Sequence, residues 1–279
     1  TDAISIFDVV LNSLIPQKGM ILTAMSHFWL MYLENIGIKT HLVAVGPDID
    51  KYLPVSLRGN PDLQTRSMVV HRLRMIPVEF IARGFLTGTG LTSYLGTGFV
   101  CGHKLPPGLQ DGDELSAVID TPTTKANRGH DLPLNAEMVR AEYPEETAFL
   151  LEIYSYISKF TRERCGIILA DTKLEFGRDK DDRIILADEV GTPDSSRYWE
   201  LSQWAVGRSR KKRVAPVPFD KQMVREWGKE KDLNPMSEVP IELIQETART
   251  YREIFWWLTR MKLETYQQRE LRINFLRVC

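Results

Sequence analysis

The chain has 279 residues, 43% of them hydrophobic, and a formal net charge of −1 at neutral pH. This length supplies a sizeable core for one large domain or two smaller lobes. The near-zero charge gives no overall field for nucleic acid or a membrane surface, and no apolar run is long enough to cross a bilayer. Three widely spaced cysteines and no signal-peptide pattern favour reduced thiols in the cytoplasm over a disulfide framework or a zinc site.

The first part of the chain mixes helical and extended patterns. Apolar residues at helical spacing predict a helix over residues 23–36 that ends at Gly37. Residues 41–46 predict a strand. Residues 67–85 begin as a strand pattern that breaks at Pro77, because proline cannot donate to a sheet ladder.

The middle of the chain is richer in turn residues. Residues 86–102 contain many Gly and Thr, which favours a loop, and residues 105–115 predict turns. Residues 117–125 predict a strand that runs into a polar loop. Residues 137–165 predict one long amphipathic helix with an apolar stripe.

Residues 166–199 predict a β-hairpin, with two strands rich in β-branched residues joined by a charged turn over 178–183. Strand alternation places three charged residues on one face of the first strand and four less polar ones on the other. The charged face carries Asp171, Lys173 and Glu175, and the drier face carries Ala170, Thr172, Leu174 and Phe176. The second strand, 183–190, is expected to end in Asp188 and Glu189.

Carboxylates gathered on one side of a hairpin repel each other unless a cation lies among them. Mg²⁺ shared with nucleotide phosphates is a common solution for such hard oxygen ligands. The following turn, Asp194 to Arg197, has residues that can bind an anion. The combination favours phosphoryl transfer, and the alternative is an ordinary solvated strand face.

The last third of the chain has a basic run, residues 208–213, which either forms a solvated loop or contacts nucleic acid. A helix is expected from about Asp220, and residues 240–278 have a helical, aromatic-rich pattern. Strand and helix patterns are interleaved along the chain, which predicts an α/β or α+β fold.

Eight segments in chain order resemble the phosphoribosylaminoimidazole-succinocarboxamide synthase, or SAICAR synthetase, family. They are TDAISIFD (1–8), IPQKGMILTAMSHFW (15–29), VVHRLRMIPVEFIARGFLTGTG (69–90), LPPGLQDGDEL (105–115), DTPTTKANRGHD (120–131), GIILADTKLEFG (166–177), IILADEVGTPDSSRYW (184–199) and FDKQMVREW (219–227). One such motif is weak evidence, whereas eight in order are specific.

The resemblance implies an ATP- and Mg²⁺-dependent ligase of purine biosynthesis that joins 5-aminoimidazole-4-carboxylate ribonucleotide to L-aspartate. It implies an acyl phosphate intermediate and a fold of two lobes related to ATP-grasp, with the nucleotide between them. We expect the lobes to span residues 1–76 and 77–279. We expect small-molecule partners rather than nucleic acid or a membrane, with a homodimer as an open alternative to a monomer.

The resemblance also implies roles for particular residues. The expected catalytic residues are Asp171, Lys173, Glu175 and Asp188, of which Glu175 and Asp188 hold the metal and the nucleotide. Glu79 and Lys125 are expected on the nucleotide side. The expected substrate-binding residues are Ser5, Asp8, Arg83, Thr89, Asp131, Ser196 and Arg197.

The chain departs from the family pattern near its start. Ala3 and Ile6 stand where the family usually has Arg and Ala, so the role of the loop from Ser5 to Asp8 is open. The family also has N-terminal strands with a Gly-Lys motif over the ATP phosphates, and we expect the native gene product to carry them before Thr1. Two alternatives follow: a kinase with another acceptor, or a degenerate, non-catalytic nucleotide-binding homologue.

Overall fold

The computed structural model describes residues 1–6, 9–125, 131–209, 214–229 and 231–274. Within them, the centre of the fold is a seven-stranded antiparallel sheet built on two long strands, β6 (Val78–Leu86) and β11 (Ile167–Arg178). β11 pairs with β6 and also with the short strands β5 (Arg74–Met75), β12 (Ile184–Ala187) and β13 (Ser196–Glu200). β6 pairs in addition with β9 (Asp113–Asp120) and β10 (Thr123–Thr124).

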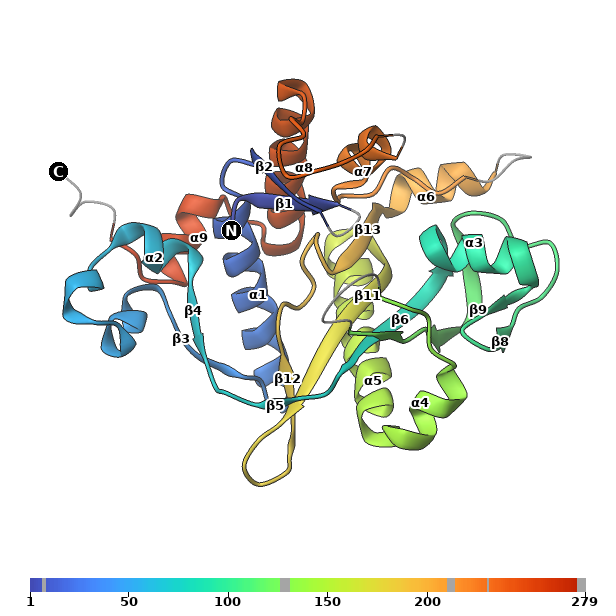
Figure 1. Ribbon diagram of the computed structural model, residues 1–279, viewed down its shortest axis with the longest axis horizontal. Helices are drawn as coiled ribbons and strands as arrows, with labels where there is room; N and C mark the ends of the chain where they lie inside the picture. The colour runs from blue at the N-terminus through green and yellow to red at the C-terminus, as the bar shows by residue number, and fades with distance from the viewer. Residues whose placement is uncertain (7–8, 126–130, 210–213, 230, 275–279) are drawn as a thin grey trace.

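One face of this sheet is covered by α5 (Pro144–Phe160), as Figure 1 shows. Leu150, Ile153 and Ile157 of this helix join a core with Phe80 of β6 and Phe176 of β11. Three further helices contribute to the same core, namely α1 (Lys18–Glu34), α8 (Ile241–Thr259) and α9 (Leu263–Arg269). Away from this core, the two long strands carry polar side chains such as Arg83 and Asp171, beside a small apolar cluster of Phe85, Ile168, Ala170 and Trp199.

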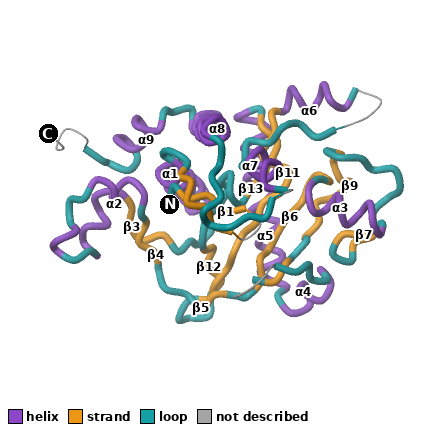
Figure 2. Tube along the Cα trace, turned by 45° about the horizontal axis from the view of Figure 1, so that its top comes forward, coloured by secondary structure: helices purple, strands orange, loops and turns teal. Residues whose placement is uncertain are grey.

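A second, smaller core lies under the N-terminal hairpin of β1 (Ala3–Ile6) and β2 (Val9–Leu14). Ile4, Ile6 and Leu11 pack there against Val224 of α7 (Gln222–Gly228) and Ala248 of α8. β1 lies beside the start of α1 in both views (Figures 1 and 2), and this chain segment is fixed there by a 2.7 Å hydrogen bond from the Gly19 amide to the Asp2 carboxylate.

The remaining elements flank the sheet. On one side are β3 (Leu42–Val45), the 3₁₀ segments Gly46–Tyr52 and Val55–Leu57, α2 (Pro61–Arg66) and β4 (Met68–Val70). On the other are α3 (Gly88–Thr97), β7 (Phe99–Val100) and β8 (His103–Lys104). The rest are α4 (Ala136–Glu142), a π-helical turn (Thr161–Cys165) and α6 (Leu201–Arg208).

Several predicted elements are confirmed. The helix predicted over 23–36 is α1, although it begins earlier, at Lys18. The strand pattern that breaks at Pro77 is resolved into β4, β5 and β6. The hairpin predicted over 166–199 is formed by β11 and β12, and the mixed α/β class is confirmed.

The prediction of a loop over 86–102 was wrong, because α3 occupies most of that stretch. The many Gly and Thr residues of this stretch suggested a loop. Leu91 and Tyr94, three positions apart, instead pack with Leu86 and Val100 in an apolar cluster. Tertiary burial outweighs the low helix propensity of glycine here. The expected turns also end sooner, since β9 already begins at Asp113.

The single helix predicted over 137–165 was also wrong in its bounds. It is divided into α4 and α5, with Pro144 at the first position of α5. Proline is tolerated at the start of a helix and not in its interior, because it lacks the amide donor.

The strict alternation predicted along β11 fails at a register shift between Leu169 and Asp171. Ala170 packs with Phe85 and Trp199, in a different cluster from Leu174 and Phe176. A bulge adds one residue to one strand and so re-aims the side chains beyond it. The second strand stops at Ala187, before the predicted Val190.

No helix among the described residues has the length and apolar content needed to cross a membrane. The division into lobes of residues 1–76 and 77–279 stays a prediction. The main core contains Met25 and Trp29 of α1 together with Leu174 of β11, so residues on the two sides of that boundary are packed together.

Candidate active site

The strand register brings two arginines to one carboxylate. Asp171 on β11 pairs directly with Arg83 of β6 on one side and with Arg197 of β13 on the other. Side chains that face each other on neighbouring strands are close enough to interact. Oδ2 of Asp171 accepts a 2.5 Å hydrogen bond from Nη1 of Arg83 and a 3.0 Å hydrogen bond from Nη1 of Arg197. Two guanidinium groups therefore share one carboxylate.

Arg83 is held in place by further contacts. Its Nε donates to Oγ1 of Thr121 at 2.9 Å, and its Nη2 donates to Oγ1 of Thr89 at 3.2 Å. The side chain is only 8% exposed. A guanidinium fixed in this way is a preorganised fork for a planar or tetrahedral oxyanion.

Arg197 lies against the start of α3. Burial lowers the pKa of Arg197, but the negative charges of Asp171 and Asp220 outweigh burial and raise it. Gly88 has a left-handed φ of 57°, and a Cβ at this position would lie 2.7 Å from Nη1 of Arg197. Glycine at position 88 therefore lets the guanidinium approach the N-terminal turn of α3.

A second group of charges lies further along the same strands. Nζ of Lys173 donates to Glu79 at 2.6 Å and lies 4.0 Å from Glu175. Glu79 also accepts a 2.9 Å hydrogen bond from Thr123, and Lys125 forms an ion pair with Glu175. Burial lowers the pKa of Lys173, but the hydrogen bond and charge of Glu79 outweigh it and raise the pKa. Lys173 therefore stays protonated between two carboxylates.

Asp188 lies next to this group. Glu175 pairs with Ala187 across the hairpin, and Asp188 follows directly, exposed and with a left-handed φ of 56°. Burial, together with the charges of Asp194 and Asp188, raises the pKa of the neighbouring Glu189 to about 7. The carboxyl groups of Asp188, Glu189 and Asp194 therefore interact electrostatically just beyond the end of β12.

A cavity of about 620 Å³ opens over the polar face of the sheet. Six of the predicted site residues line it: Arg83, Thr89, Asp171, Lys173, Ser196 and Arg197. Asp194 and Ser195 of the predicted anion-gripping turn line it too. The hydroxyl of Ser196 shares a 2.7 Å hydrogen bond with that of Thr172. Predicted site residues from three strands and one helix, β6, β11, β13 and α3, therefore converge.

Other predicted residues lie outside the cavity lining. Glu79, Lys125, Glu175 and Asp188 form the neighbouring charged group described above. Asp131 is exposed and precedes Leu132, whose amide donates to Thr124 of β10. Ser5 is exposed on β1, so it belongs to a strand rather than to the expected loop. Asp8 lies outside the described residues.

The cavity also contains charged residues that were not predicted. Asp220, Arg225 and Lys229 line it from α7 and its flanks. The Arg225 side chain makes no hydrogen bond or ion pair within the described part of the chain, although it interacts electrostatically with Asp220. A signal was present in the sequence, since Lys221, Arg225 and Lys229 follow the i, i+4, i+8 spacing of one helix face.

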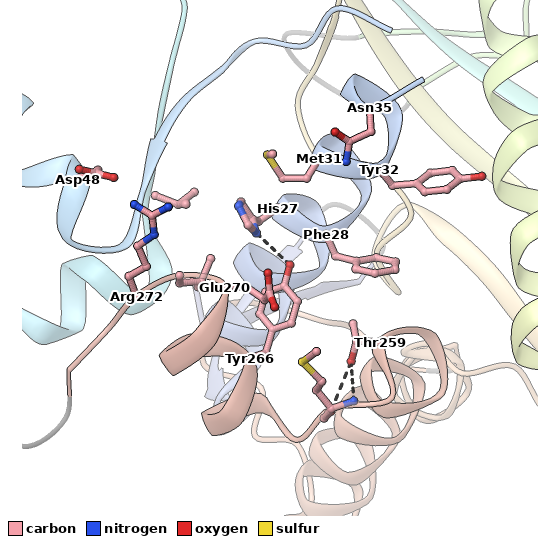
Figure 3. Close-up of a pocket in the computed structure, with 13 residues that line it drawn as sticks. His27, Phe28, Met31, Tyr32, Asn35, Asp48, Thr259, Tyr266, Glu270 and Arg272 are labelled. Atoms are coloured by element: carbon pink, nitrogen blue, oxygen red, sulfur yellow. Dashed lines mark hydrogen bonds between the residues drawn. The ribbon is translucent and has the colours of Figure 1, made fainter. Parts of the chain in front are cut away.

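Another cavity, of about 590 Å³, lies between α1, α9 and the 3₁₀ segment that contains Asp48 (Figure 3). His27, Phe28, Tyr32 and Tyr266 give it an aromatic lining, and a 2.9 Å hydrogen bond joins Nδ1 of His27 to the Tyr266 hydroxyl. None of the predicted site residues is among the residues that line it. Of these two cavities, the one over the sheet is the one that predicted site residues line.

A family model described as SAICAR synthetase matches residues 1–240. The chain belongs to the SAICAR synthetase family. The phosphoribosylaminoimidazole-succinocarboxamide synthase of Saccharomyces cerevisiae is 40% identical over 276 residues, which cover 94% of this chain and 88% of the relative. The predicted family is thus confirmed, and its members carry the name of a ligase.

Two solved structures extend the comparison. The Saccharomyces cerevisiae SAICAR synthase in complex with SAICAR has a TM-score of 0.78 and 36% identity, with 94% of this chain and 88% of that chain covered. A SAICAR synthetase in complex with ADP has a TM-score of 0.65 and 25% identity, with coverage of 94% and 89%. This chain therefore has the fold of SAICAR synthetases.

Proposed function

We propose that this chain joins 5-aminoimidazole-4-carboxylate ribonucleotide to L-aspartate, with ATP converted to ADP and phosphate, in purine biosynthesis. The observation that carries the proposal is the Arg83–Asp171–Arg197 arrangement beside a cavity of about 620 Å³. Family membership supports the reaction class, and the SAICAR and ADP complexes of relatives support the two ligand classes.

The charge balance around the cavity favours an anionic substrate. Five cationic side chains line the cavity against three carboxylates: Arg83, Lys173, Arg197, Arg225 and Lys229 against Asp171, Asp194 and Asp220. The hydroxyls of Thr89 and Ser196 supply neutral hydrogen-bonding groups. We assign the ribonucleotide phosphate to this end of the cavity, because charge-assisted bidentate contacts suit phosphate oxygens. In this proposal Asp131, and Ser5 with Asp8, contact the substrates from outside the cavity lining.

The charged group on β6, β11 and β12 is assigned to the nucleotide. Glu175 and Asp188 offer the hard carboxylate oxygens that Mg²⁺ prefers, and Asp188 directly follows Ala187, the cross-strand partner of Glu175. Among the described residues no cluster of three His, Cys, Asp or Glu is placed to hold a metal. Mg²⁺ usually keeps waters and substrate phosphates as its other ligands, so two carboxylates suffice. When bound, Mg²⁺ would neutralise charge on the phosphates.

The chemistry explains why cations surround the site. A carboxylate is a poor electrophile, so we propose that the γ-phosphoryl group of ATP is transferred to a carboxylate oxygen of the ribonucleotide, which gives an acyl phosphate and ADP. The aspartate amine then attacks the acyl carbon, the C–N bond forms, and the C–O bond to phosphate breaks as the amine loses a proton. Lys173 and Asp171 face the ribonucleotide, and Lys125 and Glu79 lie on the nucleotide side. Positioning and charge neutralisation supply most of the catalysis in such steps.

The proposal includes a two-lobed, ATP-grasp-related arrangement of residues 1–76 and 77–279 with ATP between the lobes, and a cytoplasmic site of action. The homodimer stays a prediction that analytical sedimentation can test.

A coupled ADP-release assay tests the activity. ADP release that requires both the ribonucleotide and L-aspartate, together with Mg²⁺, supports the ligase. Equal release without L-aspartate would indicate a kinase with another acceptor. Absence of release under all conditions, with nucleotide still bound, would indicate a non-catalytic homologue.

A further inference from the structure

The residue before the Ser-Ser-Arg sequence is the centre of a buried ionic cluster. Asp194 lines the cavity, and its Oδ2 accepts a 2.7 Å hydrogen bond from Nζ of Lys18, the first residue of α1. Its Oδ1 accepts a hydrogen bond from the hydroxyl of Tyr251 on α8. Nζ of Lys221 lies 3.8 Å from the same oxygen. Three distant parts of the chain therefore meet at one carboxylate.

The cluster is buried more deeply than a surface ion pair. Lys18 is 3% exposed and Tyr251 is fully buried. Burial raises the pKa of Asp194, but the charges of Lys221 and Lys18 outweigh burial and lower it. Burial also lowers the pKa of Lys221 despite the nearby carboxylate. Charges held out of water in this way need fixed geometry, since poorly oriented partners do not offset their desolvation.

Two consecutive residues contact both ends of the 194–197 turn, which consists of the turn residues Asp194 and Ser195 and the first two residues of β13. Lys221 lies near Asp194, and its neighbour Asp220 lies 3.9 Å from Nε of Arg197. Asp220 also accepts a 2.7 Å hydrogen bond from the Gln222 amide at the start of α7. The segment that leads into α7 is thus matched in charge, residue by residue, to the two ends of the 194–197 turn.

Hydrogen bonds within and just before the turn also hold its backbone in place. The Thr192 hydroxyl donates to Glu189 at 2.6 Å and accepts from the Asp194 amide at 3.2 Å. The amide of Ser196, the first residue of β13, donates to the Thr192 carbonyl at 2.8 Å. Local hydrogen bonds shape the turn, and the ionic cluster fixes it against α1, α7 and α8.

We propose that Lys18, Lys221 and Tyr251 are positioning residues that hold the 194–197 turn ready for the anionic substrate. The inference rests on the proposed function for the identity of that substrate. None of the three residues lines the cavity, so they act through Asp194 and not by touching the ligand. Without them the turn keeps its local hydrogen bonds but loses its anchor to the helices.

Tyr251→Phe tests the inference, because it removes only the hydroxyl that donates to Asp194. Tyr266→Phe is a matched control: Tyr266 is also buried and donates or accepts one hydrogen bond, with His27, in the cavity of Figure 3. We expect Tyr251→Phe to raise the KM for the ribonucleotide about threefold to tenfold, with the KM for ATP within about twofold of the wild type. Tyr266→Phe should leave both KM values unchanged.

Hydrogen exchange gives a readout that does not depend on turnover. Backbone amides in residues 192–197 should exchange faster in Tyr251→Phe and in Lys221→Met than in wild type or Tyr266→Phe, and Lys221→Arg should restore protection. Unchanged protection and unchanged ribonucleotide KM, with only a lower Tm, would overturn the inference and leave a purely structural cluster. Absence of wild-type turnover would refute the proposed function, while the exchange comparison would still decide whether the cluster orders the turn.

Discussion

Removal of the Arg197 guanidinium should weaken ribonucleotide binding far more than ATP binding. In Arg197→Ala, Asp171 keeps its 2.5 Å hydrogen bond from Arg83, and Asp220 loses a partner that was 3.9 Å away, beyond hydrogen-bond distance. Asp171 and Asp220 therefore each still accept a hydrogen bond in Arg197→Ala. The expected cost falls on the ligand, at about 1.5–3 kcal/mol for one charge-assisted contact, or about tenfold to a hundredfold in Kd.

Calorimetric titration of the same variant with the ribonucleotide and with ATP measures this difference. Arg162→Ala is a suitable control for loss of a positive charge, because its ion pair with Glu114 is about 40% exposed and such pairs contribute little to stability. The reasoning is refuted if ribonucleotide affinity is unchanged, or if both ligands lose affinity equally, which would indicate a general loosening of the fold.

Further predictions concern the metal, the turn glycine and pH. Glu175→Gln and Asp188→Asn should lose most turnover, at a cost of several kcal/mol in transition-state stabilisation, and keep the wild-type Tm; near-normal rates at saturating Mg²⁺ would remove that residue from the site. Gly88→Ala should raise the KM for the ribonucleotide, because the added Cβ would displace the guanidinium of Arg197 and the left-handed φ is strained for alanine; an unchanged KM would contradict this. Burial lowers the pKa of His27 to about 4, so the unfolded chain takes up a proton below about pH 6.5 that the folded chain accepts only near pH 4. Stability should therefore fall as pH drops from 6.5 to 4, by up to about 3 kcal/mol from this residue, and urea unfolding of His27→Gln should show a smaller loss over that range.

The sequence indicated the hairpin well because its signal is local. Alternation along a strand has a fixed period, so Asp171, Lys173 and Glu175 could be placed together from spacing alone. The arginines that contact Asp171 could not be identified from local spacing. Arg83 lies 88 positions away, and only strand register brings it to the carboxylate, so its place at the site came from family resemblance.

Features that depend on tertiary packing could not be predicted from local sequence patterns. The register shift near Asp171 leaves no mark in the residue types, and α3 forms because Tyr94 is buried, despite three glycines among its ten residues. The cluster at Asp194 joins side chains from three separate helical regions, so no single window of sequence contains it. The break at Pro144 is an exception, because a proline in a predicted helix interior is itself a warning.

Ligation through an acyl phosphate moves one carboxylate oxygen of the ribonucleotide into inorganic phosphate, and an isotope-transfer experiment detects that movement. Ribonucleotide labelled with ¹⁸O in its carboxylate is incubated with the protein, ATP, Mg²⁺ and L-aspartate, and the products are analysed by mass spectrometry. The account predicts that SAICAR is formed and that one labelled carboxylate oxygen per turnover appears in inorganic phosphate. Release of ADP without SAICAR, or formation of SAICAR with unlabelled phosphate, would contradict it.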